Sequence, residues 1–548
     1  MDLRNAVRSL ASLIVGGLVL VSGLTRWAGA QQATPAPTPA EVTDPYEAWV
    51  RDYYKVQRIP KNFGRVVSPG ILELVGPVHG TLELLGEEGD NYLARNLPVE
   101  DPRSPAHEAW LWAQLQESER LNLETKLKSA FFVVDEPDSS LVFTDRLAME
   151  DASKGLPSEG RWQMSFDVAD FNGDGKLDLV LPPPRGGDGR PIIFIQGRTL
   201  GDWQPCGSCR WPREGVKLDY GAVRVADFDV DGHLDVLLAS HFADTVVMYG
   251  DGKGDFTRYV KLPKPNQAFS ARAAAIADVD RDGRPDVVTL AELDVDIGTG
   301  QRVTGPIVSV VFNKKDGWVL GPFDGIPTEG HGDWLAVADL DTDGFPDLLI
   351  TSRKEGITSL VLRNVGGGQR WQPIAEEVMP FGSYVFSVAA GVLDDKKGRD
   401  VVYCFEQFHP LKKVEPSQAC GLYRFYDAKG QFAVPKKGEL LWKMTGYFEN
   451  PVGVAMGDLD GDGRNDIVVI FAKRPPLVLL RGLDGRWLEE RSPELEAAFG
   501  KFRAVDVRIA DLDKDGHPEL LFMGPPKDPK EGGGGVFVFR VKPRKALR

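Results

Sequence analysis

Six nine-residue segments of the chain carry oxygen-bearing side chains at the same positions. Positions 1, 3, 5 and 9 hold Asp, apart from one Asn at position 3 and one Glu at position 9. Position 6 is always Gly, whose backbone accepts conformations that other residues resist, so a tight loop can bring the four side chains to one point. The six segments are DFNGDGKLD (170–178), DFDVDGHLD (227–235), DVDRDGRPD (278–286), DLDTDGFPD (339–347), DLDGDGRND (458–466) and DLDKDGHPE (511–519).

Carboxylates that converge on one point favour a hard divalent cation. Four side-chain oxygens, one backbone carbonyl and water supply the about six or seven ligands that Ca²⁺ prefers, whereas Mg²⁺ tolerates an all-protein cage less well. Without a cation, the mutual repulsion of the carboxylates would open each loop. We therefore expect about six bound Ca²⁺ ions, one for each intact segment.

Two alternatives compete with this interpretation. A single acidic segment of this kind also occurs as a solvated surface turn, but six copies at regular spacing argue against that. The EF-hand calcium loop needs Glu at its position 12 and flanking helices. Here position 9 ends the motif, and runs rich in β-branched residues follow, such as IVVIF after Asp466, so we reject the EF-hand.

The segments mark a repeat that covers most of the chain. A seventh, damaged copy, GVLDDKKGRD, lies at 391–400, and successive copies begin 51 to 67 residues apart. Small residues precede most copies, and an apolar β-rich run follows each one. Short strands at regular spacing predict an all-β fold. Seven units of this length fit a seven-bladed β-propeller, whose blades are four-stranded sheets around an axis, with a small α+β N-terminal region before it.

The nonapeptides, their strand-forming flanks and the sevenfold count resemble the FG-GAP/VCBS repeat family, which includes the calcium-loop propellers of integrin α subunits and of many exported bacterial proteins. The resemblance covers about residues 135–548. The family places each loop between the first and second strands of a blade. Carried over by position, the resemblance implies metal ligands at the four acidic positions and at the backbone carbonyl of position 7: Asp170, Asn172, Asp174, Lys176, Asp178, Asp227, Asp229, Asp231, His233, Asp235, Asp278, Asp280, Asp282, Arg284, Asp286, Asp339, Asp341, Asp343, Phe345, Asp347, Asp458, Asp460, Asp462, Arg464, Asp466, Asp511, Asp513, Asp515, His517 and Glu519.

The damaged copy departs from this pattern, and we expect no ion there. Gly391 replaces the first carboxylate, and the segment is one residue longer than the others. Lys396 and Lys397 stand among the three remaining aspartates and would repel a divalent cation. One lysine could take the place of the ion, since its ammonium group offers three donors. A plain surface turn with both lysines in water is the alternative.

The residues before the repeat divide into three segments of different composition. Residues 1–30 join a basic start, an apolar run and the small-residue pattern of Ala28 and Ala30, which predicts a cleaved signal peptide, with an uncleaved anchor as the alternative. A Pro-rich linker (31–44) follows, and then a small α+β region (45–135) with strands and a helix that begins at Ser104. The propeller would occupy 136–548. No other stretch approaches the length of a membrane span, so we expect none in the mature chain.

Composition narrows the possible functions. The chain of 548 residues has a formal net charge of -15, which argues against nucleic acid as a partner. Four Cys and seven His are too few for a disulfide-stapled scaffold or a His-rich metal enzyme. In an exported protein, the simplest interpretation of the cysteines is two local disulfides, Cys206 with Cys209 and Cys404 with Cys420.

Two functions remain open from the sequence. The predicted export to the periplasm, the cell exterior or the cell surface, the many loops and the resemblance favour a non-enzymatic binding or adhesion scaffold for a protein or glycan. The alternative is an extracellular polysaccharide hydrolase or lyase with a propeller fold. Such an enzyme would need a catalytic constellation; His241, His331 and His409 lie outside the calcium segments, but no paired motif accompanies them. Glycan binding without turnover would distinguish the two functions.

The C-terminal unit of the repeat is one strand short. After the seventh segment, only ELLFMG and GVFVFRVKP remain as strands, and together with the strand before the segment they make three. The run SSLVFTDRL at 139–147 precedes the first segment at the position of an outer strand. We expect it to pair with residues 535–542 and to close the ring, since closure removes exposed strand edges.

Overall fold

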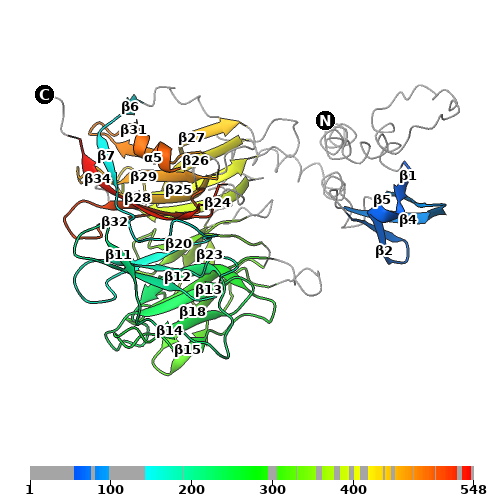
Figure 1. Cartoon of the computed structure of the whole chain (residues 1–548), viewed down its shortest axis with the longest axis horizontal. Coiled ribbons are helices and arrows are strands. Elements are labelled where there is room, and N and C mark those ends of the chain that lie inside the picture. Colours follow the sequence, from blue (N-terminus) through cyan, green and yellow to red (C-terminus); the bar gives the residue numbers. More distant parts are fainter. Residues whose placement is uncertain are drawn as a thin grey trace. The chain divides into compact units, whose positions relative to one another are not determined.

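The computed structural model of the chain (Figure 1) describes residues 55–75, 80–97, 142–187, 189–293, 305–328, 330–352, 361–374, 383–393, 400–407, 417–435, 438–445, 451–472, 474–499, 502–527 and 533–544. Contacts divide the chain into two compact units, one of 1–126 with 408–415 and one of 127–407 with 416–548. The predicted signal peptide, the linker and the helix expected from Ser104 lie outside the described residues. None of the helices in the described ranges is long and apolar enough to cross a membrane.

The described part of the first unit is one antiparallel sheet with the strand order β1-β5-β4-β3-β2. Side chains along β3 alternate between buried and half-buried, as expected for a sheet with one covered face. The core consists of Ile59, Leu72, Leu74, Leu82 and Ala94. The elements are β1 (Gln57–Pro60), the 3-10 helix η1 (Lys61–Phe63), β2 (Gly64–Ser68), β3 (Ile71–Leu74), β4 (Gly80–Glu88) and β5 (Asn91–Asn96).

The described part of the second unit contains seven sheets, and within each the strands of the repeat pair antiparallel in chain order. The first four sheets are β8 (Asp167–Ala169), β9 (Asp178–Leu181), β10 (Ile192–Gln196) and β11 (Trp203–Pro205); β12 (Gly221–Ala226), β13 (Asp235–Ser240), β14 (Thr245–Tyr249) and β15 (Arg258–Lys261); β16 (Ala271–Ala277), β17 (Asp286–Ala291), β18 (Val308–Lys314) and β19 (Gly317–Leu320); and β20 (Leu335–Ala338), β21 (Asp347–Ile350), β22 (Val361–Asn364) and β23 (Trp371–Pro373).

The last three sheets follow the same plan, but the sixth and seventh each gain a strand from the segment before β8. They are β24 (Ser383–Gly391), β25 (Asp400–Gln407), β26 (Ser417–Arg424) and β27 (Glu439–Thr445); β28 (Pro451–Gly457), β29 (Asp466–Phe471), β30 (Leu477–Arg481), β31 (Trp487–Glu490) and β6 (Val142–Thr144); and β32 (Asp506–Ala510), β33 (Glu519–Gly524), β34 (Gly535–Pro543) and β7 (Leu147–Asp151). A short helix, α5 (Pro493–Ala498), connects the sixth sheet to the seventh.

The first strand of each sheet contacts the first strand of the next, from β8 through β12, β16, β20, β24 and β28 to β32. Alanines fill much of β16, and such small side chains let neighbouring sheets approach closely. Hydrogen bonds also connect the seventh sheet to the start of the first. The Phe166 N–H, just before β8, donates to the Asp506 carboxylate at 3.1 Å, and the Arg508 guanidinium donates to the Phe166 carbonyl at 2.9 Å.

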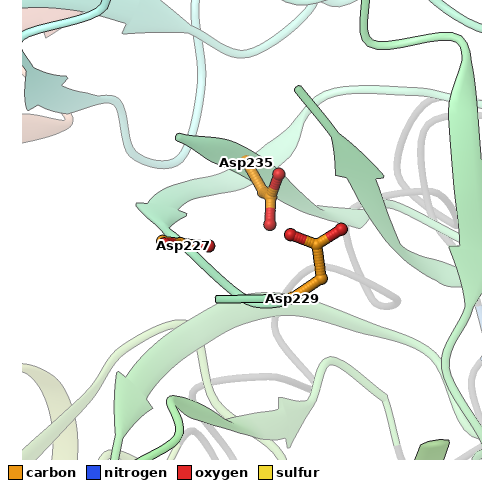
Figure 2. A group of neighbouring side chains, drawn as sticks. All are labelled: Asp227, Asp229 and Asp235. Carbon is orange, nitrogen blue, oxygen red and sulfur yellow. The ribbon is translucent and has the colours of Figure 1, made fainter. Parts of the chain in front are cut away.

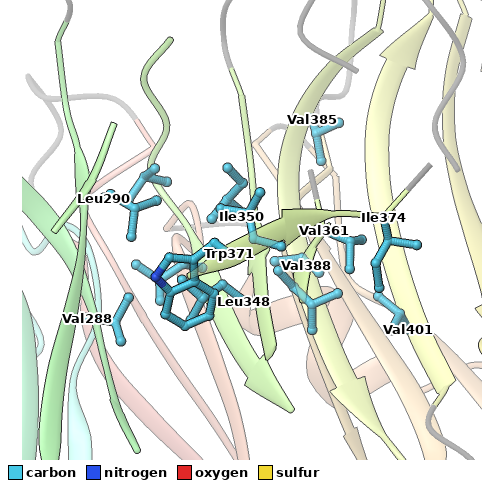
Figure 3. Close-up of a cluster of buried hydrophobic side chains, with 14 of the residues drawn as sticks. Val288, Leu290, Leu348, Ile350, Val361, Trp371, Ile374, Val385, Val388 and Val401 are labelled. Atoms are coloured by element: carbon cyan, nitrogen blue, oxygen red, sulfur yellow. The ribbon is translucent and has the colours of Figure 1, made fainter. Parts of the chain in front are cut away.

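The second strands form the most deeply buried layer of this unit. Every residue of β13, β17, β29 and β33 is buried. Figure 3 shows the packing between neighbouring sheets, where Trp371 lies among Val288, Leu290, Leu348 and Ile350. Each such side chain contributes about 1.5–3 kcal/mol when it is removed from water. The apolar runs after each acidic segment are therefore core strands covered on both faces.

The missing outer strand of the seventh sheet comes from the expected part of the chain, but from other residues. β7 pairs antiparallel with β34, with Leu147 opposite Pro543. The prediction of 139–147 was wrong in its bounds, because β6, which lies inside that range, pairs parallel with β31 of the sixth sheet. Burial explains the difference, since Leu147 and Met149 are 0% and 3% exposed, whereas Phe143 is 56% exposed.

Glu490 fixes the point where the chain leaves the sixth sheet for the seventh. Its buried carboxylate accepts the N–H groups of Arg146 at 3.0 Å and Leu147 at 2.7 Å. These bonds offset the cost of removing the carboxylate from water. The sequence pattern could not locate this turn, because Glu490 and Leu147 are 343 residues apart in the chain.

Strand β7 should contribute strongly to stability if it completes the seventh sheet. Leu147→Ala removes a fully buried side chain from this strand, so the free energy of unfolding should fall by about 2–5 kcal/mol. Glu150→Ala in the same strand is the matched control, since Glu150 pairs with Lys542 at the surface and its loss should cost about 0–1 kcal/mol. Urea denaturation measures both variants, and equal effects would contradict the closure by β7.

Candidate metal centres

The six intact acidic segments all connect the first strand of a sheet to its second strand, as the resemblance implied. Position 9 is in every case the first residue of the second strand. Position 1 directly follows the first strand in the first four loops and in the sixth and seventh. The residues that begin second strands are Asp178 in β9, Asp235 in β13, Asp286 in β17, Asp347 in β21, Asp466 in β29 and Glu519 in β33.

Each position-9 side chain is fully buried and links its loop to the sheet. One carboxylate oxygen accepts the N–H of position 2 in the same loop, at 2.8 to 3.0 Å. In five sheets the other oxygen accepts an N–H at the end of the third strand, at 2.7 to 2.8 Å. Those donors are Gln196, Gly250, Asn313, Asn364 and Arg481.

Position 1 shapes the turn of the loop. Its carboxylate accepts the N–H of the position-6 glycine in all six loops, at 2.7 to 3.0 Å. The six glycines have φ values between 83° and 90°. Only glycine takes this conformation without a steric cost, which explains why position 6 does not vary.

Position 4 is a second constrained position, which the sequence pattern did not reveal. Its φ lies between 55° and 61° at Val230, Arg281, Thr342 and Lys514, and Gly173 and Gly461 fill the other two loops, also with positive φ. A left-handed conformation costs a non-glycine residue about 1–2 kcal/mol, and a β-branched side chain such as Val or Thr is the least suited to it. The varied residue types at position 4 gave no signal of this strain.

Five of the six loops bring three carboxylates together, with one oxygen of each within 4.8 Å of the others. Figure 2 shows the second loop, where the carboxylates of Asp227, Asp229 and Asp235 face a common point. The first loop offers the Asn172 amide oxygen at position 3, which accepts the Asp174 N–H at 2.9 Å. The other four groups are Asp278, Asp280 and Asp282; Asp339, Asp341 and Asp347; Asp458, Asp460 and Asp466; and Asp511, Asp513 and Glu519.

Several loop oxygens are buried without a hydrogen-bond partner in the described part of the chain. Leaving a buried polar atom unpaired costs about 1–3 kcal/mol, so each such atom needs an explanation. A bound cation would satisfy them, and several hard oxygen donors around one point suit Ca²⁺. The clusters are therefore compatible with calcium loops. These atoms are Asp229 Oδ1, Asp280 Oδ1, Asp339 Oδ1, Asp341 Oδ2, Asp513 Oδ1 and Glu519 Oε1. Asp341 Oδ2 and Glu519 Oε1 nevertheless face the guanidinium groups of Arg363 and Arg540.

Burial raises the pKa of every position-9 carboxyl group. The pKa is raised to about 6 for Asp178, Asp235 and Asp286. It is raised to about 7 for the three others, Asp347, Asp466 and Glu519. Removal from water is the main cause, and nearby loop carboxylates raise the pKa further, while the N–H donors lower it. Protons therefore remain on metal-free loops close to neutral pH.

Basic side chains from the third or fourth strand reach four of the clusters, which the sequence pattern did not show. Every one of them pairs with the carboxylate of position 3. A tethered cation at this place competes with a divalent ion for the same oxygens. In the first loop, by contrast, the Lys176 ammonium donates to the carbonyls of Gly197 and Arg198. The four pairs are Arg258 with Asp229, Lys314 with Asp280, Arg363 with Asp341, and Arg540 with Asp513.

The damaged fifth loop is described only at its two ends. Asp394, Asp395 and both lysines lie outside the described residues, so the lysine hypothesis stays a prediction. Asp400 begins β25 and is buried, like the other position-9 residues. The prediction of an extra residue in this segment was wrong, because Gly391 pairs with Asp400 just as Gly457, the residue before position 1, pairs with Asp466. Val392 therefore takes position 1 of the fifth loop. The two oxygens of Asp400 accept the Leu393 N–H at 2.8 Å and the Tyr426 O–H at 2.9 Å. Both oxygens of this carboxylate thus accept protein donors, as at position 9 of five intact loops, and the absence of an ion from the fifth loop stays a prediction.

The position-7 residues contact the clusters through their backbone N–H groups. Each N–H donates to the position-5 carboxylate of its own loop, at 2.8 to 3.1 Å. A ligand role for the position-7 carbonyls stays a prediction. The six residues are Lys176, His233, Arg284, Phe345, Arg464 and His517.

Only one of the two predicted disulfides is formed. Cys206 and Cys209 form the predicted disulfide. The disulfide predicted between Cys404 and Cys420 is not formed, although these residues lie directly opposite each other on β25 and β26, with their sulfurs 2.7 Å apart. Burial raises the pKa of the Cys420 thiol.

The histidines considered for catalysis lie in separate surroundings. His409 is outside the described residues, and His331 is half-buried shortly before β20. His241 Nδ1 lies 2.6 Å from the buried Glu292 carboxylate, and its ring packs on Tyr220 with centroids 4.5 Å apart. These contacts join the ends of the second and third sheets.

Comparison with known proteins identifies the acidic repeats. A family model described as FG-GAP-like repeat matches residues 227–289 and 458–522, so the chain carries FG-GAP-like repeats. Integrin alpha pat-2 of Caenorhabditis elegans is 24% identical over 265 residues, which cover 40% of this chain and 20% of that protein. The Caenorhabditis briggsae protein of the same name is 25% identical over the same shares. The match thus spans about a fifth of the length of these relatives.

The solved structures found by comparison share little sequence with this chain, and their TM-scores are low. A BBS1N structure in complex with ARL6DN has a TM-score of 0.42 and 11% identity, and covers 74% of this chain and 99% of that one. An Agrocybe aegerita lectin that recognises non-reducing terminal N-acetylglucosamine has a TM-score of 0.38 and 17% identity, over 61% and 79% of the two chains. The Neurospora crassa Pan2 WD40 domain has a TM-score of 0.35 and 11% identity, over 71% and 97%.

Metal-free protein should lose stability as the pH rises from about 5 to 8. Because the position-9 pKa values are raised to about 6 or 7, the folded chain holds more protons than the unfolded chain over this range, and stability falls as these protons leave. Melting temperatures in metal-free buffer measure the effect. Asp466→Asn should flatten the dependence, whereas Asp251→Asn, at an exposed turn outside the loops, should not. Stability that rises with pH would contradict the raised pKa values.

Proposed function

We propose that this chain, which carries FG-GAP-like repeats, is a seven-bladed calcium-binding β-propeller that acts as a non-enzymatic binding or adhesion scaffold for a protein or glycan. The observation that carries the proposal is the recurrence of one carboxylate loop between the first and second strands of six sheets. The similarity to integrin alpha pat-2 supports a binding role.

The contacts between the sheets support seven blades. Seven sheets of the same strand order follow one another, and their first strands touch in sequence. The hydrogen bonds of Phe166 with Asp506 and Arg508 connect the seventh sheet to the start of the first. β7 gives the seventh sheet an outer strand from the beginning of the repeat. A closed ring of this kind leaves no unpaired edge between its first and last blades.

Calcium at the six intact loops would be held by positions 1, 3, 5 and 9. The buried oxygens without a partner in Asp229, Asp280 and Asp513 support this assignment. The ion would supply positive charge that offsets the repulsion among the carboxylates and holds the turn to the second strand. We propose six ions and none in the fifth loop, whose sequence places Lys396 and Lys397 among its aspartates.

The two ends of the sheets carry different connections. In each sheet the acidic loop lies at one end of the strands, and the connections from the second to the third strand lie at the other. The metal loops therefore stiffen one end, and the opposite end presents connections that can contact a ligand. Export is part of the proposal, supported by the predicted signal peptide and by the disulfide between Cys206 and Cys209.

Removal of calcium should lower the stability of the protein strongly. An ion at about 100 times its Kd adds about 2.7 kcal/mol per site, so EGTA should lower the melting temperature by about 10 °C or more. Ca²⁺ should restore it, and Mg²⁺ should not do so fully. Native mass spectrometry should count six ions, and five in Asp229→Asn, while Asp251→Asn keeps all six. An unchanged melting curve after verified metal removal would contradict the calcium assignment.

The fourth loop should bind calcium more tightly when its internal cation is removed. Arg363 pairs with Asp341, whose side chain is only 3% exposed. Arg363→Met removes the competing charge, so the Kd of one ion should fall by about 10-fold, while the metal-free protein melts at a lower temperature. Arg370→Met is the control, because Arg370 is exposed and pairs with Asp324 at the surface. Weaker calcium binding in Arg363→Met would show that this arginine assists the ion.

A further inference from the structure

A pocket rich in arginine lies outside the metal loops, where the connection from the first sheet to the second passes the outer strand β15. Its volume is about 480 Å³, and its lining includes Arg190, Arg210 and Arg213 together with Trp211 and Tyr259. The only acidic residue of the lining is Glu214. Three guanidinium groups around one concavity contrast with the chain as a whole, whose formal net charge is -15.

The wall of the pocket is held in place by covalent and hydrogen bonds. The disulfide between Cys206 and Cys209 closes the start of the connection. The Arg210 N–H donates to the Gly254 carbonyl at 2.7 Å, and the Arg210 carbonyl accepts the Phe256 N–H at 2.8 Å. These bonds fix the arginine-bearing segment against the second sheet, so little ordering entropy would be lost when a ligand binds.

Two aromatic side chains complete this wall. Trp211 stacks on Phe256 with ring centroids 4.7 Å apart and is 7% exposed. The Tyr259 hydroxyl donates to the Glu214 carbonyl at 3.1 Å, which positions the tyrosine ring beside the cavity. An aromatic ring offers a flat apolar surface next to the charged groups of the arginines.

The arginines differ in how far the protein neutralises them. Arg210 pairs with Asp255 at 2.8 Å, although its side chain remains 70% exposed. Arg213 is exposed and has no ion pair among the described residues. A guanidinium group binds a carboxylate or sulfate through two parallel hydrogen bonds, so Arg213 can serve an anionic ligand without breaking an internal pair.

We infer that this pocket binds the acidic sugar of an anionic polysaccharide, through its carboxylate or sulfate group. This inference rests on the proposed scaffold function and names the class of its ligand. A cavity of this volume suits a small ring-shaped unit. Protein partners instead cover flat patches of about 800 Å² on each side or add a strand to a sheet edge. The tyrosine ring would face the apolar side of the sugar.

The test measures binding of the full calcium-loaded chain to four oligosaccharide and peptide probes by isothermal titration calorimetry. The probes are an oligogalacturonate, a chondroitin sulfate hexasaccharide, a neutral cello-oligosaccharide and an oligoglutamate of matched charge. We expect one or both acidic saccharides to bind and the neutral one not to bind. The two acidic arms distinguish carboxylate from sulfate recognition. Oligoglutamate that binds as tightly as the saccharides, or no acidic saccharide that binds, would overturn the inference.

Arg213→Gln locates the binding in this pocket. The variant should weaken binding of the acidic saccharide by about 10-fold or more, since a charge-assisted hydrogen bond is lost. The control is Arg486→Gln, at an exposed arginine in a turn of the sixth sheet, and it should bind like the parent. An unchanged melting temperature shows that both variants fold. Saccharide binding that survives Arg213→Gln would refute the pocket and leave the scaffold function intact, because calcium-dependent melting tests that separately.

Discussion

The buried carboxylate at position 9 is the contact on which each repeat depends. It starts the second strand, accepts the N–H of position 2 in its own loop and, in five sheets, also an N–H at the end of the third strand. One side chain therefore fixes the metal loop, the core strand and the next strand relative to one another. The fifth sheet supports the central place of position 9. Its acidic segment is damaged, yet Asp400 is kept at position 9 and is buried with the same bond to the loop.

The same arrangement creates an electrostatic problem that the loops solve in different ways. Burial raises the pKa of the position-9 groups, as at Asp347, and neighbouring carboxylates add repulsion. A proton, a divalent ion or the cationic side chain of a neighbouring strand can each offset this negative charge. Lys314, Arg363 and Arg540 supply such a cation in their sheets, whereas the Lys176 ammonium of the first loop donates to carbonyls. Loops with one sequence motif thus differ in their surroundings, and we expect them to differ in calcium affinity.

Closure of the last sheet is a separate constraint from the loops. β7 completes the seventh sheet, and β6 lies against the sixth, so one short segment fastens both. Glu490 holds the turn between these strands through two backbone N–H groups. The wall of the arginine pocket is held in a different way from the loops. It carries no metal loop and is fixed by a disulfide and by hydrogen bonds to residues 254–256.

The sequence alone determined the repeat, the strand type and the acidic positions, because spacing and apolar runs are local and recur. It also identified the Cys206–Cys209 bridge, whose partners are neighbours in the chain. Tertiary structure decided what depends on residues far apart in sequence. The reach of Arg540 into the seventh loop and the bounds of β7 are examples. Pairing between strands sets these features, since a side chain's partner is fixed by strand register and burial and not by its neighbours in the chain.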